Sequence, residues 1–446
     1  MTEPFRPPLL IVADSPEALT DLCGISLLER MRRIALQLGF REAMILSNSV
    51  KAIAAHLANE SWHRADLSLT FRERTGANVT VGDILNCLPA LRVASDGRVV
   101  IVFAGFYCDE RLLRSVAGAQ TDSVLIDSDP PSIIAPLLEN SDSDSSRLLC
   151  AALLSSEWLF RQNRAGTLVE EITSDAMAGR IARVDAAQQQ AYVQSMRRTV
   201  RPVFFPAPSL ERRPLAEHCL RDATQKGALD FPALVHAPIE KWLVSHLCRT
   251  PITPNQITVG TGVLGVGVTL LYACGYLWAG VLVAVVIGVL DGVDGKLARL
   301  KAQTTKIGKR EHDLDYVVET SWWAALAYHF HATGPVRYAY VIFFAFFVFH
   351  RLERAATKAV RRRIGRNLDD FTPFDRLVRL VAGRRNIYTW LFTFFVVIGA
   401  PATGFICLCF WGIASAVIHI FRALQIGFTE QNKSCANVNG RVKEAA

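Results

Sequence analysis

Residues 277–308 read LWAGVLVAVVIGVLDGVDGKLARLKAQTTKIG, an apolar run that ends at two aspartates, Asp291 and Asp294. Carboxylates at the end of a membrane-length segment are costly unless they serve a site. Two carboxylates three positions apart on a helix lie on one face, where their oxygens can hold a hard divalent cation. The stretch therefore predicts a metal site, suited to phosphoryl transfer, at the end of a transmembrane helix.

The residues that follow the aspartates suit a phosphate ligand. Gly295 and Ala298 leave room for a bulky diphosphate, and Arg299 offers a planar fork of donors for phosphate oxygens. With Gly308 they complete the spacing Asp-x2-Asp-Gly-x2-Ala-Arg-x8-Gly. These fixed positions resemble the signature of the CDP-alcohol phosphotransferase family. The alternative is that the pattern has no catalytic function and is a loop with a helix-capping Asp and turn glycines.

The end of the pattern departs from that family. Its third and fourth aspartates would fall at positions that are His312 and Tyr316 here. Three nearby carboxylates are spaced four apart and share one helical face: Glu311, Asp315 and Glu319. A one-residue deletion after Gly308 would put Glu311 at the third position and Asp315 at the fourth. We therefore expect Glu311 to bind the metal and Asp315 to act as general base.

Other assignments of these carboxylates stay open. Asp313 competes for the third position, and Asp315 with Glu319 is another pair. An acidic face at a helix start is also favoured by the helix dipole alone. In that interpretation Glu319 only buttresses the site.

The resemblance implies a reaction. Mg²⁺ or Mn²⁺, held by Asp291, Asp294 and Glu311, would neutralise the diphosphate of a CDP-alcohol. Asp315 would take the proton of an acceptor hydroxyl as CMP leaves. The family carries a Pro-Asn-x-x-Thr element at the nucleotide pocket, which matches residues 254–258 here. The residues expected to line the nucleotide and diphosphate site are Thr258, Gly295, Ala298, Arg299 and Gly308.

Composition places this site in a membrane. Hydrophobic residues make up 51% of the 446 positions, and the mean hydropathy is +0.23. The apolar excess lies in the second half. Several apolar segments are short for a span, which needs roughly 20 residues. Six of them predict an all-α, six-helix transmembrane domain: Ile257–Tyr276, Leu277–Leu290, Val317–His331, Val336–Phe349, Ile387–Ala400 and Phe405–Phe421.

Charge predicts the orientation of these helices. Residues 351–385 carry eleven Lys or Arg against four Asp or Glu, and the whole chain carries +8. Because basic loops stay cytoplasmic, the active site and the N-terminal half are expected on the cytosolic side of a bacterial-type inner membrane. Arg361, Arg376 or Arg379 is a candidate for binding the acceptor's phosphate, although attraction to lipid headgroups also explains such a cluster. Anionic lipids are the expected partners of this charge, and nucleic acid is not.

A shorter helix is expected before the first span. Residues 234–248 alternate apolar and polar positions at helical spacing, and Lys241 and Trp242 suit a headgroup interface. A helix lying on the membrane is the first interpretation, and a packed connector is the second. The expected divisions are an N-terminal domain (1–215), a connector with this juxtamembrane helix (216–255), a membrane domain (256–425) and a tail (426–446).

The first half alternates expected strands and helices, which predicts a Rossmann-like α/β domain. Its order resembles a sugar-nucleotidyltransferase domain, especially GISLLERM at 24–31 and LGFREAMIL at 38–46. The first turn, residues 14–24, has no glycine-rich cradle and no basic residue. Asp109 is the remnant that could stand for the family's metal-binding Asp. We therefore expect a degenerate, inactive nucleotidyltransferase-like domain.

The order of the two halves is itself informative. It resembles the bifunctional enzymes that join inositol-1-phosphate cytidylyltransferase to di-myo-inositol-phosphate-phosphate synthase, and residues 216–230 look like their join. The resemblance implies phospholipid or inositol-phosphate synthesis, with a CDP-alcohol donor, a small or lipid alcohol as acceptor, and a homodimer. Two other classes stay open. One is a transporter or channel with Asp291 and Asp294 on an ion path, and the other is a catalytically inactive membrane scaffold.

Overall fold

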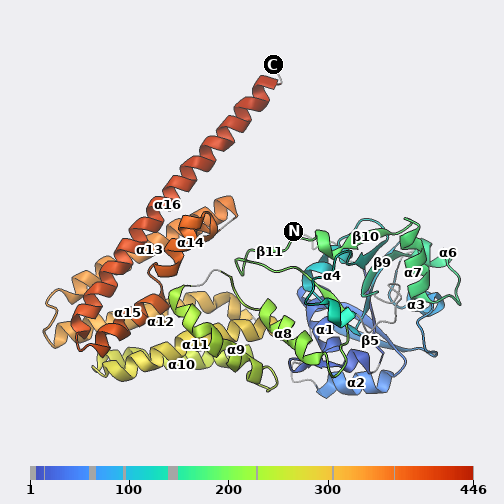
Figure 1. Ribbon diagram of the computed structural model, residues 1–446, viewed down its shortest axis with the longest axis horizontal. Helices are drawn as coiled ribbons and strands as arrows, with labels where there is room; N and C mark the ends of the chain where they lie inside the picture. Colours follow the sequence, from blue (N-terminus) through green and yellow to red (C-terminus); the bar gives the residue numbers. More distant parts are fainter. Residues whose placement is uncertain are drawn as a thin grey trace.

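The computed structural model describes residues 7–14, 16–59, 67–93, 97–138, 149–227, 230–303, 306–365 and 367–444, without the side chains at 59, 306–314, 370 and 428–444. An α/β domain and a helical half lie at opposite ends of the chain's long axis, and α8 and α9 lie between them (Figure 1). The expected two-part architecture is therefore confirmed.

The N-terminal domain is built on a seven-stranded sheet with the order β10-β8-β9-β6-β1-β4-β5. Neighbouring strands pair in parallel, except that β9 runs antiparallel to both β6 and β8. The strands that the sequence predicts at 9–13, 43–47, 67–71, 99–104 and 124–127 are all present, whereas β9 and β10 are additions. The strands are β1 (Leu9–Val12), β4 (Glu42–Ser47), β5 (Ser68–Glu73), β6 (Arg98–Phe103), β8 (Ser123–Ile126), β9 (Ala151–Ser155) and β10 (Ala182–Asp185).

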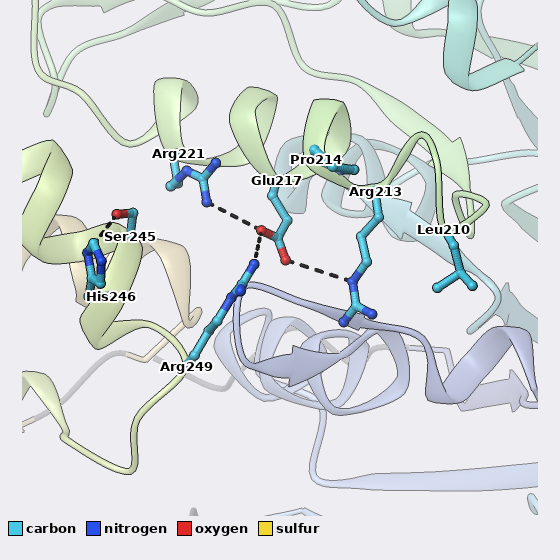
Figure 2. A pocket seen from close by; sticks show the side chains of 8 residues that line it. All are labelled: Leu210, Arg213, Pro214, Glu217, Arg221, Ser245, His246 and Arg249. Atoms are coloured by element: carbon cyan, nitrogen blue, oxygen red, sulfur yellow. Dashed lines mark hydrogen bonds and ion pairs between the residues drawn. The ribbon is translucent and has the colours of Figure 1, made fainter.

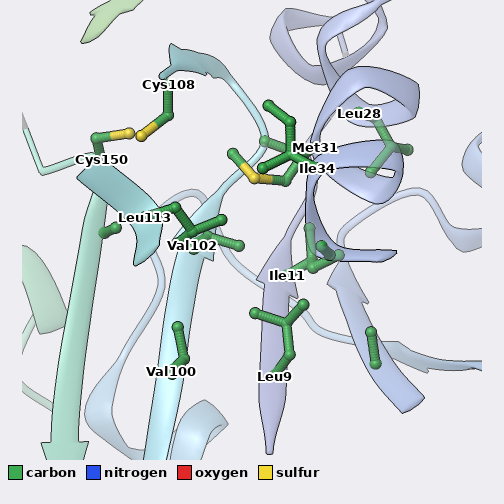
Figure 3. Close-up of a cluster of buried hydrophobic side chains, with 14 of the residues drawn as sticks. Leu9, Ile11, Leu28, Met31, Ile34, Val100, Val102, Cys108, Leu113 and Cys150 are labelled. Atoms are coloured by element: carbon green, nitrogen blue, oxygen red, sulfur yellow. The ribbon is translucent and has the colours of Figure 1, made fainter. Parts of the chain in front are cut away.

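Helices cover both faces of this sheet because alternate strand residues point to opposite sides. Leu9, Ile11, Val100 and Val102 face one buried cluster, which includes side chains of α1, α2 and α4 (Figure 3). Leu10 and its alternating neighbours face a second cluster with α3, α6 and α7. The helices are α1 (Leu27–Gln37), α2 (Val50–Asn59), α3 (Val81–Cys87), α4 (Glu110–Ala117), α5 (Ala135–Leu138), α6 (Ser156–Arg161) and α7 (Leu168–Met177).

Short strand pairs extend from the sheet domain toward the helical half. A hairpin of β11 and β12 is important for the site, because its turn reaches the helical half. The pairs are β2 (Asp21–Leu22) with β3 (Ile25–Ser26), β7 (Phe106–Cys108) with β13 (Phe204–Pro206), and β11 (Tyr192–Val193) with β12 (Arg198–Thr199).

The helical half places a helix over each of the six expected apolar segments. In the part of the chain that the structure describes, three helices are long and apolar enough to cross a membrane: α10, α11 and residues 401–427 of α16. The helices are α8 (Arg213–Ala223), α9 (Phe231–Leu247), α10 (Pro254–Ala273), α11 (Leu277–Leu300), α12 (Lys306–Ala332), α13 (Ala339–Ile364), α14 (Pro373–Val381), α15 (Arg385–Val397) and α16 (Pro401–Glu444).

Local sequence explains where α10 begins. The Thr253 hydroxyl accepts from the Gln256 amide, the Gln256 side chain accepts from the Thr253 amide, and Pro254 occupies the first turn. Glycines then let the helices approach closely: the Tyr272 ring lies against Gly280 of α11. This close approach brings the start of α10 beside the motif at the end of α11.

Helix α9 runs along α11 in the same direction. His236 lies 3.1 Å from the position of a Cβ at Gly288, and the Glu240 carboxylate lies closer still to that of a Cβ at Gly292, so a side chain at Gly292 would force Glu240 to move. Glu240 also forms a 2.6 Å ion pair with Lys296. The residues of α9 that are buried toward this contact recur every fourth position: Pro232, His236, Glu240, Val244 and Cys248.

Candidate functional site

The two motif aspartates lie on the last turns of α11, as the sequence predicts. Asp291 is 35% exposed and forms a 2.6 Å ion pair with Arg385, the first residue of α15. No pattern in the sequence connects Arg385 with the motif, because the two lie far apart along the chain. The pair shows that the site is shared between α11 and the start of α15.

Asp294 is almost completely buried, with 4% of its surface exposed. The Thr258 hydroxyl donates to its Oδ2 at 2.8 Å, which links α10 to the motif. The expected role of Thr258 at the nucleotide pocket stays a prediction. Thr258 lies in the second turn of α10, which the capping box at Thr253 positions. A buried carboxylate needs such donors because an unpaired charge is costly away from water.

The Arg299 side chain folds back over Gly295. A Cβ at Gly295 would lie 3.4 Å from Arg299 Nη1, which is an ordinary contact. Arg299 Nε donates to the Thr224 carbonyl at 3.0 Å, so the connector after α8 fixes one side of the guanidinium. Ala298 is half-buried beside them, and Gly308 falls in the first turn of α12. The turn of α11 after the aspartates thus carries small residues packed beside Arg299.

The acidic residues of α12 approach the same place. Asp315 and Glu319, both half-buried, interact electrostatically with the Arg385 guanidinium that binds Asp291. Asp315 is therefore near the motif, and its role as general base stays a prediction. The side chains of Glu311 and Asp313 lie outside the described residues, so their expected roles stay predictions.

The donor set fits a hard divalent cation. Asp291 and Asp294 present carboxylate oxygens from neighbouring turns of α11. The Arg385 guanidinium supplies, beside Asp291, the positive charge that a bound cation would supply. Among the side chains that the structure describes, no group of three His, Cys, Asp or Glu residues comes together as a metal site. A third ligand from the start of α12 would complete the set.

A second group of charges lies beside the motif. Asp369, buried in the loop after α13, binds three arginines: Arg197 at 3.1 Å, Arg384 at 3.0 Å, and Arg379. Burial alone would raise the pKa of Asp369, but the three arginines outweigh it and hold the pKa below its usual value. Arg197 comes from the β11–β12 hairpin, so the N-terminal domain contributes directly to this group.

The connector between α8 and α9 continues this basic surface. Gly227 donates its amide to the Met196 carbonyl at 2.9 Å, which fastens the connector to the hairpin turn. The Lys226 ammonium group lies close enough to interact electrostatically with Arg299, Asp291 and Arg197. Of the three arginines suggested for the acceptor's phosphate, the structure brings Arg379 into this group.

Helix α1 of the N-terminal domain forms hydrogen bonds with the C-terminal end of α11, the helix that carries the motif. Helix C-termini leave carbonyls without intrahelical partners. Arg30, Arg33 and Gln37, which share one face of α1, satisfy three of them. Arg30 Nη1 donates to the Leu300 carbonyl at 2.5 Å, Arg33 Nη1 to Lys301 at 2.9 Å, and Gln37 Nε2 to Ala302 at 2.8 Å. In the sequence, the only sign of this contact is that the three polar residues are spaced on one face of the helix. Helical periodicity alone does not say which partner that face contacts.

The N-terminal sheet edge that would hold a nucleotide is occupied by internal contacts. Asp14, just after β1, binds Arg74 and accepts from the Asn48 amide at 3.1 Å. Asp109 caps α4 and forms a 2.9 Å ion pair with Arg111. Both carboxylates are thus held by contacts within the N-terminal domain, and the degenerate character of this domain stays a prediction.

Comparison with known proteins follows the same division of the chain. Residues 251–406 match the model of the CDP-alcohol phosphatidyltransferase family, which confirms the family predicted from the motif for the helical half. A stretch of 86 residues is 41% identical to the bifunctional IPC transferase and DIPP synthase of Thermococcus kodakarensis. That match covers 19% of this chain and 20% of the relative, so the chain spans about a fifth of the curated relative's length.

Two solved structures each match part of the chain. Mycobacterium tuberculosis phosphatidylinositol phosphate synthase, with CDP-DAG bound, is 17% identical with a TM-score of 0.32, and the match covers 42% of this chain and 93% of that one. The inositol-1-phosphate CTP transferase of T. maritima is 9% identical with a TM-score of 0.32, and that match covers 48% of this chain and 98% of the other.

Proposed function

We propose, from the premise that residues 251–406 form a CDP-alcohol phosphatidyltransferase domain, that this protein transfers a substituted phosphate group from a CDP-alcohol to an acceptor hydroxyl and releases CMP. The observation that carries the proposal is the arrangement around Asp294. The carboxylate is buried, Thr258 of α10 holds it, and Asp291 lies one turn away beside Arg385. Such a pair at a helix end serves a site rather than the fold.

The residues of this chain take distinct roles in the proposed reaction. Arg299, held by the Thr224 carbonyl, binds an oxygen of the donor's diphosphate. Asp315 accepts the proton of the attacking hydroxyl. The reaction then depends mainly on positioning and on stabilising negative charge.

Asp291 and Asp294, with Glu311 as third ligand, would hold Mg²⁺ or Mn²⁺. Such an ion, when bound, would neutralise the diphosphate and stabilise the leaving CMP. Arg385 pairs with the Asp291 carboxylate at 2.6 Å and would compete with such an ion for it. The Thr258 hydroxyl donates to Asp294 and fixes the orientation of that carboxylate.

The acceptor is proposed to carry a phosphate of its own. Asp369 holds Arg379 and Arg384, and Arg379 is close enough to Lys226 to interact with it electrostatically, so positive charge gathers beside the site. Guanidinium groups bind phosphate oxygens in a planar fork, which favours a phosphorylated alcohol over a neutral one. The relatives named for inositol phosphates support this class of acceptor.

We further propose that the motif end of the helices faces the cytosol, because its loops carry most of the basic residues of this half. The N-terminal domain then lies in the cytosol and acts as a support for α11 rather than as a second enzyme. The CDP-alcohol would in that case be supplied by a separate nucleotidyl-transfer reaction.

The experiment is a screen of CDP-linked alcohols with the purified full-length protein and Mg²⁺, reading CMP. The variants Asp291→Asn and Asp294→Asn should each lower CMP release on the order of 10²–10³-fold, as expected when a group that stabilises transition-state charge is removed. Glu157→Gln, an exposed carboxylate of the N-terminal domain, is the matched control and should retain full activity. Undiminished CMP release in both aspartate variants would exclude the site.

The same preparation tests the two other classes. Calorimetry with CDP and Mg²⁺ separates an enzyme from a scaffold, because an intact pocket binds the nucleotide. Ion flux through proteoliposomes that disappears in Asp291→Asn, without any CMP release, would favour a channel.

A further inference from the structure

A cavity lies outside the motif site, where α8 meets the end of α9 (Figure 2). Its volume is about 450 Å³. It is lined by Leu210, Arg213, Pro214, Glu217, Arg221, Ser245, His246 and Arg249. Three arginines and a histidine thus surround a single carboxylate, that of Glu217.

Glu217 is fully engaged by the protein. Its side chain is 3% exposed and pairs with Arg249 at 2.9 Å, Arg221 at 3.3 Å and Arg213 at 3.8 Å. The Cys23 amide also donates to it at 3.3 Å. One negative charge therefore faces three positive ones, and Asp21, at 3.0 Å from Arg213, offsets only one of them.

The arginines keep donors for another anion. A guanidinium carries five N–H donors, and its contact with Glu217 uses one or two of them. The side chains of Arg249, Arg213 and Arg221 are 65%, 33% and 26% exposed, so a ligand in the cavity can contact each of them. The chemistry of the cavity is that of a phosphate site.

Helix α9 leads from this cavity along an exposed apolar face. The face turns apolar side chains outward at helical spacing, opposite the face that packs on α11. Its large exposed residues are Phe231, Leu234, Val235, Ile239 and Trp242. Ser245, His246 and Arg249 continue the same stripe, so one helix face is apolar at its start and basic at its end.

The register between α9 and α11 fixes the depth of this stripe. The apolar run of α11 ends at Leu290, and the motif that follows it is proposed to face the cytosol. His236 lies against Gly288, so the first turns of α9, with their exposed apolar residues, lie beside the end of this run. Cys248 packs with Leu297 and Leu300, and Lys301 Nζ donates to the Thr250 carbonyl at 2.8 Å. The basic end of the stripe is therefore at headgroup level.

We propose that this cavity binds the phosphate of an anionic phospholipid whose acyl chains lie along the exposed face of α9. The order is that of a lipid: apolar chains beside Phe231–Trp242, the amphipathic Trp242 ring at the boundary, and the phosphate among Arg213, Arg221 and Arg249. The Trp242 ring lies 4.7 Å from the His246 ring, so the two parts of the site are continuous. The site is separate from the Asp291–Asp294 motif and does not depend on the proposed reaction.

Such a lipid would fasten the N-terminal domain to the membrane. Arg213 and Arg221 belong to α8, and the Cys23 amide that Glu217 binds belongs to the β2–β3 turn. Arg249 follows α9 directly. A phosphate bridging these arginines would hold α8 against α9 and relieve the repulsion among three like charges.

The test uses the full-length protein in a neutral maltoside detergent. Dihexanoyl phosphatidic acid, dihexanoyl phosphatidylcholine and inorganic phosphate are titrated separately, and binding is measured by calorimetry and by the shift in unfolding temperature. The phosphatidic acid should bind and raise the unfolding temperature, and the other two should bind at least about tenfold more weakly. Equal affinity for phosphatidylcholine or for inorganic phosphate would overturn the proposal.

Variants locate the binding. The double variant Arg221→Gln/Arg249→Gln should weaken phosphatidic acid at least about tenfold, while Arg161→Gln, an equally exposed arginine of the N-terminal domain, should leave it unchanged. Trp242→Ala should weaken phosphatidic acid but not inorganic phosphate. Unchanged lipid binding in the double variant would contradict the proposal. Asp291→Asn should also bind the lipid normally, so failure of the proposed reaction is distinguishable from failure of this site.

Discussion

Arg385 and Asp291 form a 2.6 Å ion pair that joins the start of α15 to the motif turn of α11. The two residues are far apart in sequence, and only the packing of α15 on α11 brings them together. The pair places a fixed positive charge at the position where a divalent cation and a diphosphate are proposed to bind. It also links Asp291 to Asp315 and Glu319 of α12, which face the same guanidinium.

The first prediction concerns this ion pair. Arg385→Gln should lower the Mg²⁺ concentration that gives half-maximal CMP release by about two- to fivefold, because the arginine no longer competes for the Asp291 carboxylate. That factor is the one expected for a partly exposed ion pair worth up to about 1 kcal/mol. A Mg²⁺ titration of the initial rate measures it. Arg337→Gln, an exposed arginine far from the motif, should leave the titration unchanged, and a rise in the Mg²⁺ requirement of Arg385→Gln would contradict the competition.

The second prediction concerns the hydrogen bond from Thr258 to Asp294. Thr258→Val keeps the shape of the side chain but removes the donor, so the buried carboxylate should move or lose its orientation. Metal affinity should fall about 10- to 100-fold, as it does when a partner of a metal ligand is removed. Thr261→Val is the matched control, since the Thr261 hydroxyl only donates to the Thr258 carbonyl within α10. Equal metal affinities in the two variants would argue against a metal at Asp294.

The third prediction concerns the grip of α1 on α11. Arg33 binds both Glu29 and the Lys301 carbonyl, whereas Arg32 binds Glu29 at 2.6 Å on the same helix. Arg33→Met should therefore destabilise the full chain by about 1.5–3 kcal/mol more than Arg32→Met, the range for a hydrogen bond to a charged group. Thermal unfolding measures this difference. Arg33→Met should also slow CMP release while the KM for the CDP-alcohol stays the same, and full activity would remove the positioning role.

The fourth prediction concerns Asp369. Asp369→Asn leaves Arg197, Arg379 and Arg384 close together without their shared carboxylate. Breaking a buried ion pair from one side costs about 3–5 kcal/mol, and the free energy of unfolding should fall by that order. Arg197→Gln removes only the contribution of the N-terminal hairpin, so it should cost less and raise the KM for a phosphorylated acceptor. An Arg197→Gln variant as unstable as Asp369→Asn would contradict this division.

The fifth prediction concerns pH. Burial alone would raise the pKa of Glu217, but the hydrogen bonds from Arg249 and the Cys23 amide outweigh it, and the pKa lies below its usual value. A carboxylate with a depressed pKa stabilises the fold above its unfolded pKa, about 4.3, and loses that contribution as the pH falls through the folded value. Thermal unfolding between pH 6 and pH 3 should show this loss. Glu217→Gln should be less stable at pH 6 and should depend less on pH across that range.

Much of the fold follows from local pattern. The strands at β1, β4, β6 and β8 are mostly buried apolar runs, and the helices between them repeat apolar residues at helical spacing. Strand β5 is instead an exposed strand at the edge of the sheet. The motif spacing likewise places Asp291, Asp294 and Arg299 on one helix, because a helix has a fixed period. The antiparallel strand β9 was not predicted, since a short run such as Ala151–Ser155 carries no signal for its direction.

The contacts that complete the site could not be predicted in the same way. Arg385 meets Asp291 and Arg33 meets the Lys301 carbonyl only because separate helices pack in one register. The sequence showed basic residues near the motif, but Arg361, Arg376 and Arg379 looked equivalent there. Tertiary structure distinguishes them by burying Arg379 against Asp369.

Taken alone, the sequence determined the motif, the helix that carries it and the α/β character of the first half, because each depends on residues that are close along the chain. Only the tertiary structure decided that α1 holds the end of α11, that Arg385 faces Asp291, and that the basic end of α9 meets the arginines of α8. These contacts join residues from distant segments, and their geometry is set by which surfaces pack together rather than by any local period.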